Sequence, residues 1–134
     1  MKNLVIDLDH TICTPAEQED QAEDKNLKYS NAVPDRDFVA RMHEYKAMGF
    51  HITIHTSRNM RTFGGDVDAI RANTLPIIID WLGRHEIPYD DIVVGKPWCG
   101  FDGFYIDDRA IRPSEFKGRT LGEINDLLAA ERTA

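Results

Sequence analysis

The segment LVIDLDHT at residues 4–11 decides the fold class, because an apolar run meets acidic residues there. Its first three residues, LVI, form a continuous run that is typical of a strand buried on both faces of a parallel sheet. Asp7 and Asp9 follow directly, and in open α/β sheets ligands bind at the carboxyl ends of the strands. The segment therefore predicts a buried strand whose end carries two carboxylates at a binding edge.

Outward from this segment, strand and helix patterns alternate along the chain. Further strands are expected at 50–55, 92–94 and 104–106. Three helical regions are expected. The first has Phe38, Met42 and Tyr45 on its apolar face. The second has Pro76 at its start and Leu75, Ile78, Ile79 and Leu82 on its apolar face, and the third has Ile124, Leu127 and Leu128 after a capping box at 120–123. The order β-α-β-α-β-β-α predicts an α/β fold, a three-layer α/β/α sandwich around a mostly parallel, Rossmann-like sheet.

Length and charge limit the organisation and the partners. The 134 residues suffice for one core, and we expect a single domain over 1–134 with an acidic flap at about 14–31. Within that flap, residues 16–24 (AEQEDQAED) hold five acids and no base, which is typical of a solvated loop. The net charge of −7 disfavours nucleic acid as a partner, because phosphate backbones reward clustered Lys and Arg.

The sequence also predicts a cytoplasmic location without a membrane partner. No apolar stretch approaches the ~20 residues that a bilayer-spanning helix needs. The start, MKNLVIDLDHT, has neither the long apolar region nor the cleavage site of a signal peptide. Cys13 and Cys99 form no disulfide framework and no zinc signature, so we expect ordinary reduced thiols.

Each predicted strand ends in, or shortly before, a reactive polar group. After the first strand come the two acids, and the later strands lead to TSR at 56–58, GKP at 95–97 and DDR at 107–109. One such coincidence would mean little, since Asp is a common turn residue. Because the carboxyl ends of parallel strands meet at one edge of a sheet, we expect all four groups to converge.

The residue types fit in-line attack on phosphorus, which needs a nucleophile, charge neutralisation and a proton for the leaving oxygen. Asp7 can be the nucleophile, and Asp9 can protonate the leaving alcohol and then activate water. Thr56 and Lys96 can hold phosphate oxygens. Arg58 can clamp the phosphate with its guanidinium, or it can pair with the acids of the fourth group or solvate its loop. We therefore predict two catalytic acids and three phosphate-binding residues.

A cation is expected at the same edge because four carboxylates would repel one another and an anionic substrate. A like-charged pair ~4 Å apart costs about 4 kcal/mol at an effective dielectric near 20. The predicted ligands are all hard oxygen donors, which favour Mg²⁺ over zinc. They are Asp7, Asp9, Asp107 and Asp108.

In this order the segments resemble the motifs of haloacid dehalogenase (HAD) superfamily hydrolases, over nearly the whole chain. DLDHT at 7–11 is similar to the first motif, Asp-x-Asp-x-Thr, and Thr56, Lys96 and the pair 107–108 are similar to the second, third and fourth motifs. The resemblance implies a nucleophile at the first acid and an acid/base at the second. It also implies Mg²⁺ held by the nucleophile, the backbone carbonyl of Asp9 and an acid at 107 or 108.

Longer stretches of the sequence resemble, more narrowly, a group of short bacterial proteins known as capsular-polysaccharide-biosynthesis phosphatases. The similar stretches are TSRNMR at 56–61, NTLPIIIDWL at 73–82 and VGKPWCGFDGFYIDDRAIRPSEF at 94–116, whereas the stretch 16–30 is longer than the group implies. The resemblance implies a phosphatase of a small sugar-phosphate-type metabolite. The spacing of the motifs leaves no room for a large cap domain, and an uncapped cleft is compatible with a homo-oligomer.

Two other functions remain open at this point. An uncapped cleft would also admit a macromolecular substrate, such as a polynucleotide end or a phosphoprotein. A non-catalytic regulatory or assembly module would keep the fold without turnover, and the loss of a motif residue would mark it. None of the motif residues is missing.

Overall fold

The computed structural model describes residues 2–16 and 27–133, and the chain divides into two compact units, Met1–Trp98 and Cys99–Ala134. Of the acidic loop predicted at 16–24, only Ala16 lies within the described residues. The expected flap at 14–31 is therefore described only at its two ends.

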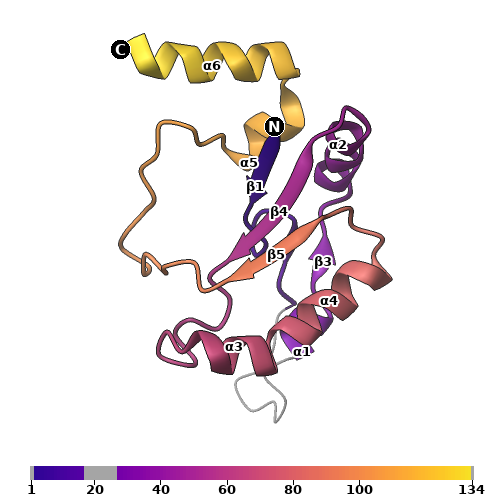
Figure 1. Ribbon diagram of the computed structural model, residues 1–134, viewed down its shortest axis with the longest axis vertical. Helices are drawn as coiled ribbons and strands as arrows, with labels where there is room; N and C mark the ends of the chain where they lie inside the picture. Colours follow the sequence, from indigo (N-terminus) through magenta and orange to yellow (C-terminus); the bar gives the residue numbers. More distant parts are fainter. Residues whose placement is uncertain (1, 17–26, 134) are drawn as a thin grey trace. The chain divides into compact units, whose positions relative to one another are not determined.

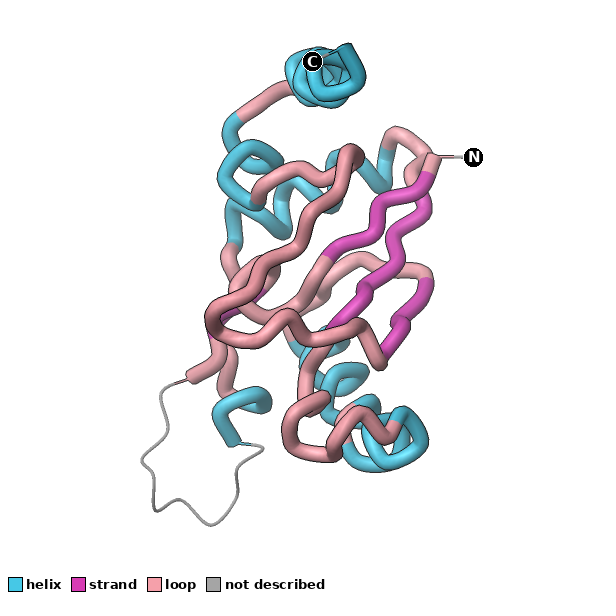
Figure 2. Tube along the Cα trace, turned by 90° about the vertical axis from the view of Figure 1, so that its left-hand side faces the viewer, coloured by secondary structure: helices cyan, strands magenta, loops and turns pink. Residues whose placement is uncertain are grey.

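A parallel three-stranded sheet in the order β1-β4-β5 forms the first unit's main sheet (Figures 1 and 2). The strands are β1 (Asn3–Ile6), β4 (His51–Thr56) and β5 (Asp91–Val94). Ile6 pairs with Ile54, and Thr56 pairs with Val94. Because the strands are parallel, their carboxyl ends lie at the same edge of the sheet. The apolar runs predicted each boundary of these three strands to within one residue.

Only one face of this sheet is buried in the structure. The buried side chains on that face are Ile6, Ile52, Ile54, Thr56 and Val94. On the opposite face Val5 is 67% exposed. The prediction that the first strand is buried on both faces is therefore wrong for Val5, because successive strand residues point to opposite faces and only one face is packed.

The helices of the first unit supply the rest of the core. They are α1 (Leu27–Ser30), α2 (Arg36–Ala47), α3 (Val67–Asn73) and α4 (Leu75–Arg84). As predicted, α2 buries Phe38, Met42 and Tyr45, and its N-cap Asp35 accepts a hydrogen bond from the Phe38 N–H. These contacts fix where the helix begins and which face it buries.

The apolar face of α4 differs from the predicted one by one residue. The structure buries Ile78 and Leu82 as expected, with Pro76 in the first turn, but Ile79 is 47% exposed and Trp81 is buried in its place. Positions 78, 81 and 82 share a helix face through i+3 and i+4 spacing, which leaves 79 at the solvent side. The indole N–H of Trp81 donates to the Ala32 carbonyl, which removes the cost of burying it.

A short antiparallel ribbon was not expected from the sequence. It pairs β2 (Cys13–Thr14) with β3 (Val33–Pro34). Two-residue strands carry too little periodicity to be recognised from sequence. The two strands of the ribbon precede and follow α1 in the sequence. Because they pair with each other, the segment that contains α1 begins and ends close to the end of β1.

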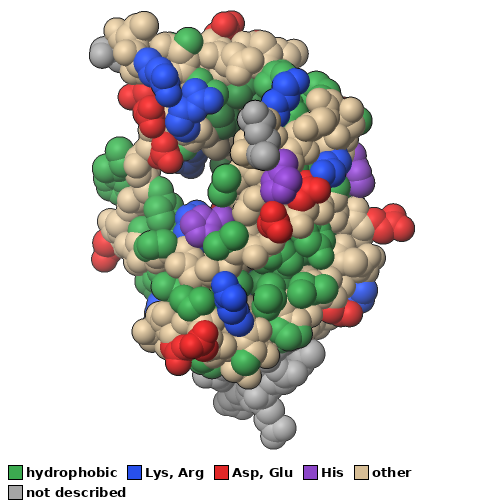
Figure 3. Space-filling model, viewed as in Figure 1, with side chains coloured by type: hydrophobic (Ala, Val, Ile, Leu, Met, Phe, Trp, Pro, Cys, Tyr) green, Lys and Arg blue, Asp and Glu red, His purple; other side chains and the backbone are tan. Residues whose placement is uncertain are grey.

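The second unit contains α5 (Pro113–Gly118) and α6 (Leu121–Thr133) and no strand among its described residues. The predicted strand at 104–106 is wrong in this structure: Ile106 is 87% exposed, because no neighbouring strand pairs with the segment. Figure 3 shows that apolar side chains reach the molecular surface, and the exposed ones include Phe101, Phe104 and Ile106. The capping box of α6 is confirmed, since Thr120 and Glu123 exchange hydrogen bonds.

The described part of the chain is thus an α/β protein with an open parallel sheet and helices. None of its helices is both long and apolar enough to cross a membrane.

Candidate active site

The loop after β1 turns back sharply, and this turn sets the positions of Asp7 and Asp9. The Leu8 carbonyl accepts hydrogen bonds from the N–H groups of Ile12 at 2.9 Å and of Thr11 and Cys13 at 3.3 Å. His10 has a φ of 62°, a left-handed conformation that glycine adopts with less strain. Leu8 and Ile12 are fully buried and anchor the loop in the core.

The end of β4 contributes the second group of site residues. The Thr56 side chain is buried, and its Oγ1 accepts a hydrogen bond from the Arg58 N–H at 3.0 Å. A hydroxyl that accepts one hydrogen bond still has its own O–H to donate. The backbone turn at 56–58 is therefore fixed by a side chain that remains able to donate to a phosphate oxygen.

Lys96 lies after β5 and is tied to the end of β4. Its backbone N–H donates to the Thr56 carbonyl at 3.1 Å. Gly95, just before it, has a φ of 87°, and a Cβ there would lie 3.0 Å from the Val67 side chain. The turn that places Lys96 thus needs glycine, both for its conformation and for the close approach of α3.

Asp7 and Lys96 face each other at this edge of the sheet. The Lys96 Nζ lies 3.8 Å from Oδ1 of Asp7, and both side chains are largely but not fully buried. Burial raises the pKa of the Asp7 carboxyl above its usual value, and the Lys96 ammonium opposes that rise. Burial and the same ammonium lower the pKa of His55, so its imidazole is neutral at pH 7. The pair leaves one partly accessible carboxylate beside one cation.

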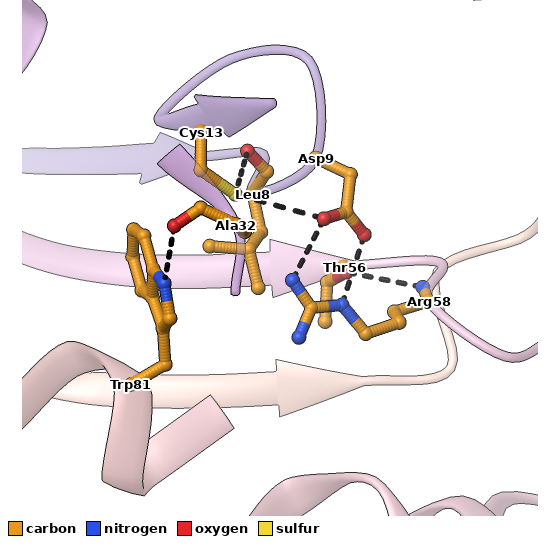
Figure 4. A network of polar contacts seen from close by, with 7 residues as sticks. All are labelled: Leu8, Asp9, Cys13, Ala32, Thr56, Arg58 and Trp81. Atoms are coloured by element: carbon orange, nitrogen blue, oxygen red, sulfur yellow. Dashed lines mark hydrogen bonds and ion pairs between the residues drawn. The ribbon is translucent and has the colours of Figure 1, made fainter. Parts of the chain in front are cut away.

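Asp9 is held by Arg58, as Figure 4 shows. Nε of Arg58 donates to Oδ2 of Asp9 at 3.0 Å, and the neighbouring guanidinium nitrogen donates to Oδ1 at 2.7 Å. The Arg58 side chain is 1% exposed. Of the alternatives left open for Arg58, pairing with an acid is the one found, but the acid belongs to the first motif.

Two further residues contact this pair and were not predicted as site residues. The Tyr29 ring of α1 lies with its centroid 4.2 Å from Cζ of Arg58, a cation–π arrangement. The Cys13 thiol lies 3.7 Å from Oδ1 of Asp9. Spacing could not have found them, because they belong to α1 and to the ribbon, the two elements that the sequence pattern did not predict.

Cys13 is not available as a nucleophile or as a soft metal ligand. Burial, together with the charge of Asp9, raises the pKa of the Cys13 thiol to about 12. The thiol is therefore protonated at neutral pH, and it is the thiolate that attacks or binds metals. This agrees with the expectation of an ordinary reduced thiol.

The structure thus brings together Asp7, Asp9, Thr56, Arg58 and Lys96 in the first unit. Asp107 and Asp108 belong to the second unit and are exposed there. Within that unit, Asp107 accepts a hydrogen bond from the Arg109 N–H, and Asp108 lies 3.8 Å from Arg132.

The donor atoms that the first unit offers at this edge are oxygens, which is the type that a hard cation prefers. Asp7 offers a carboxylate that faces Lys96, whereas the nearby thiol of Cys13 stays protonated. Among the described residues, no three His, Cys, Asp or Glu side chains gather closely enough to hold a metal ion.

Comparison with known proteins gives one match over the full length. The chain is similar to a crystal structure of a structural-genomics target from Vibrio cholerae, with 50% sequence identity and a TM-score of 0.86. The match covers 98% of this chain and 99% of the Vibrio protein. The two proteins belong to one family. No protein-family model matches the chain, and no curated protein does.

This family relationship supports the fold and leaves the chemistry to be inferred from the site. At this identity and coverage, the Vibrio protein and this chain share their α/β architecture from end to end.

Proposed function

We propose that this protein is a Mg²⁺-dependent phosphatase that hydrolyses a phosphate monoester through an aspartyl-phosphate on Asp7. The observation that carries the proposal is the pair formed by Asp7 and Lys96, 3.8 Å apart at the carboxyl edge of the sheet. A carboxylate beside a cation can attack phosphorus while the cation neutralises an equatorial oxygen. Asp9 and Thr56 at the same edge supply a second carboxyl and a hydroxyl.

Two proton transfers and two displacements complete the reaction. A carboxylate oxygen of Asp7 attacks phosphorus and forms the aspartyl-phosphate. The ester P–O bond breaks at the same time, and Asp9 protonates the leaving alcohol. Water then attacks the phosphoryl group, Asp9 takes the water proton, and inorganic phosphate leaves Asp7 free. Lys96 and Thr56 hold phosphoryl oxygens in both steps.

Mg²⁺ would be held by oxygen donors, with Asp7 from the first unit and Asp107 or Asp108 from the second. When bound, it would neutralise negative charge on the transferring phosphoryl group. For Asp9, the proposed contribution is its backbone carbonyl, as the resemblance to HAD hydrolases implies.

We also infer a finer fold, the HAD-like three-layer sandwich. Parallel sheets are almost always covered on both faces, and here Val5 and Val93 of the open face are exposed. In a three-layer sandwich a further layer would cover the face that carries these two residues.

A phosphatase screen tests the proposal. Sugar, polyol, aryl and nucleotide phosphates are incubated with the protein with Mg²⁺ and with chelator, and released phosphate is measured. We expect Mg²⁺-dependent release that collapses in Asp7→Asn and persists in the matched control Asp37→Asn, an exposed acid on α2. Full turnover in Asp7→Asn would exclude the mechanism.

The same screen separates the substrate classes. We expect preference for small sugar-phosphate-type metabolites, as the family resemblance implies, and the net charge of −7 disfavours polynucleotides. Preference for end-phosphorylated oligonucleotides or phosphoproteins would reverse this choice. No turnover of any ester despite measurable Mg²⁺ binding would favour the non-catalytic module.

A further inference from the structure

Arg58 makes a forked contact that fixes the plane of the Asp9 carboxylate. The two hydrogen bonds, of 3.0 and 2.7 Å, run from adjacent guanidinium nitrogens to the two carboxylate oxygens. Such bidentate pairs are stronger and more specific in orientation than single hydrogen bonds. The carboxylate can neither rotate about its last bond nor swing away without breaking both.

Arg58 is itself held by two further contacts. Its backbone N–H donates to Oγ1 of Thr56, which fixes the turn after β4. The Tyr29 ring covers the guanidinium at 4.2 Å. The remaining terminal nitrogen, Nη1, is buried and has no hydrogen-bond partner among the described residues. The position of Arg58 is therefore determined by its surroundings and not by a flexible surface loop.

This geometry bears on the phosphate-binding role that the sequence predicts for Arg58. A phosphate clamp must present at least two N–H groups to an accessible space. In Arg58, Nε and one terminal nitrogen are engaged by Asp9, and the other terminal nitrogen is buried. The side chain is 1% exposed, so an anion has no direct path to it.

We propose that Arg58 is a positioning residue that acts on phosphoryl transfer through Asp9, with the Tyr29 ring as its support, and that it does not bind phosphate. The inference rests on the proposed function, since it assigns a role in that reaction. A carboxylate has about four lone-pair sites on its two oxygens. Arg58 occupies one site on each oxygen and the Cys13 thiol contacts Oδ1, so Oδ2 of Asp9 keeps a site for the proton that passes to the leaving alcohol.

Leaving-group dependence tests the proposal. The alkoxide of an alkyl phosphate needs a proton in order to leave, whereas the nitrophenolate of a nitrophenyl phosphate leaves readily as an anion. A positioned acid contributes roughly 10²–10⁴-fold to such a step. We expect Arg58→Met to lower kcat/KM for the alkyl ester at least ~10-fold more than for the aryl ester. Asp9→Asn should show the same selective loss.

A double-mutant cycle shows whether Arg58 acts through Asp9. In the Asp9→Asn background, Arg58→Met should change kcat/KM for the alkyl ester by less than ~2-fold, since coupled residues are not additive. Tyr29→Leu should give the selective loss in weaker form. The matched control is Arg41→Met, which removes an exposed arginine paired with Glu44 on α2 and should leave both rates unchanged.

Other results would overturn the proposal. Equal loss of kcat/KM for both esters in Arg58→Met, or a raised KM together with weaker inhibition by inorganic phosphate, identifies a phosphate ligand instead. If Arg58→Met fails to fold in thermal unfolding, Arg58→Lys and Tyr29→Leu carry the same comparison of esters. A wild-type protein that hydrolyses neither ester overturns the proposed function and this role with it, whereas an active wild type with unselective variants overturns only the role.

Discussion

At the scale of single residues, Gly95 determines how Lys96 reaches the site. Its φ of 87° costs an L-residue roughly 1–2 kcal/mol, and a Cβ would also press on Val67 at 3.0 Å. We expect Gly95→Ala to destabilise the protein by more than this conformational cost. The comparison is Gly49→Ala, where φ is 90° but a Cβ would meet no atom of the described residues within 4 Å.

Urea unfolding of the two variants separates clash from strain. The excess loss of unfolding free energy in Gly95→Ala over Gly49→Ala measures the contact with Val67. Equal losses in the two variants would mean that α3 yields without cost and that only the backbone conformation matters there.

Asp90 is a residue whose charge links two elements. Its side chain accepts hydrogen bonds from Lys46 at the end of α2 and from the Ile52 N–H of β4. These contacts lower the pKa of the Asp90 carboxyl below its usual value. A carboxylate with a lowered folded-state pKa stabilises the fold above its unfolded pKa, near 3.8, and this contribution is lost as the pH falls through the folded value.

Asp90→Asn should therefore be less stable than wild type at pH 7, with a difference that shrinks below about pH 4. Urea unfolding at several pH values measures this. Asp80→Asn, which removes an exposed carboxylate paired with Arg84 within α4, serves as the control and should change little. A difference that does not depend on pH would show that the Asp90 charge is not what stabilises the junction.

At the scale of elements, the sequence predicted what regular periodicity encodes. Three strands and the long helices followed from apolar runs and caps, whereas the β2–β3 ribbon and α1 are too short to carry a period. Ile79 was misassigned because α4 carries more apolar residues than one helix face can bury, and Trp81 is buried in its place. At the site, the residue types predicted the grouping of Asp7, Thr56 and Lys96, but no pattern could predict the partner that Arg58 takes.

The segment 104–106 carries a strand-like apolar run that forms no strand in the structure. Because Ile106 is 87% exposed, Ile106→Asp should change the free energy of unfolding by no more than about 0.5 kcal/mol. Denaturant unfolding measures this change, and Phe101→Asp, at another exposed residue of the same unit, is the control. A loss of about 2 kcal/mol or more in Ile106→Asp alone would contradict the exposure of this segment.

At the scale of the whole molecule, the proposed chemistry assigns Asp7 and one acid at 107–108 as ligands of the cation. A ligand that binds only the folded state stabilises it by about 2.7 kcal/mol at 100 times its Kd. We expect Mg²⁺ to raise the Tm of the wild type, and this rise should vanish in Asp7→Asn and in one of Asp107→Asn and Asp108→Asn. Asp126→Asn in α6 changes the net charge equally and should keep the rise.

The pattern of these shifts decides more than the presence of a metal. Loss of the Mg²⁺ effect both in Asp7→Asn and in a variant at 107–108 means that both carboxylates contribute to binding the ion. It would also tell which acid at 107–108 is the ligand, since only that variant loses the shift. Loss in Asp7→Asn alone would leave Mg²⁺ bound within the first unit, and the four-carboxylate centre would then be wrong.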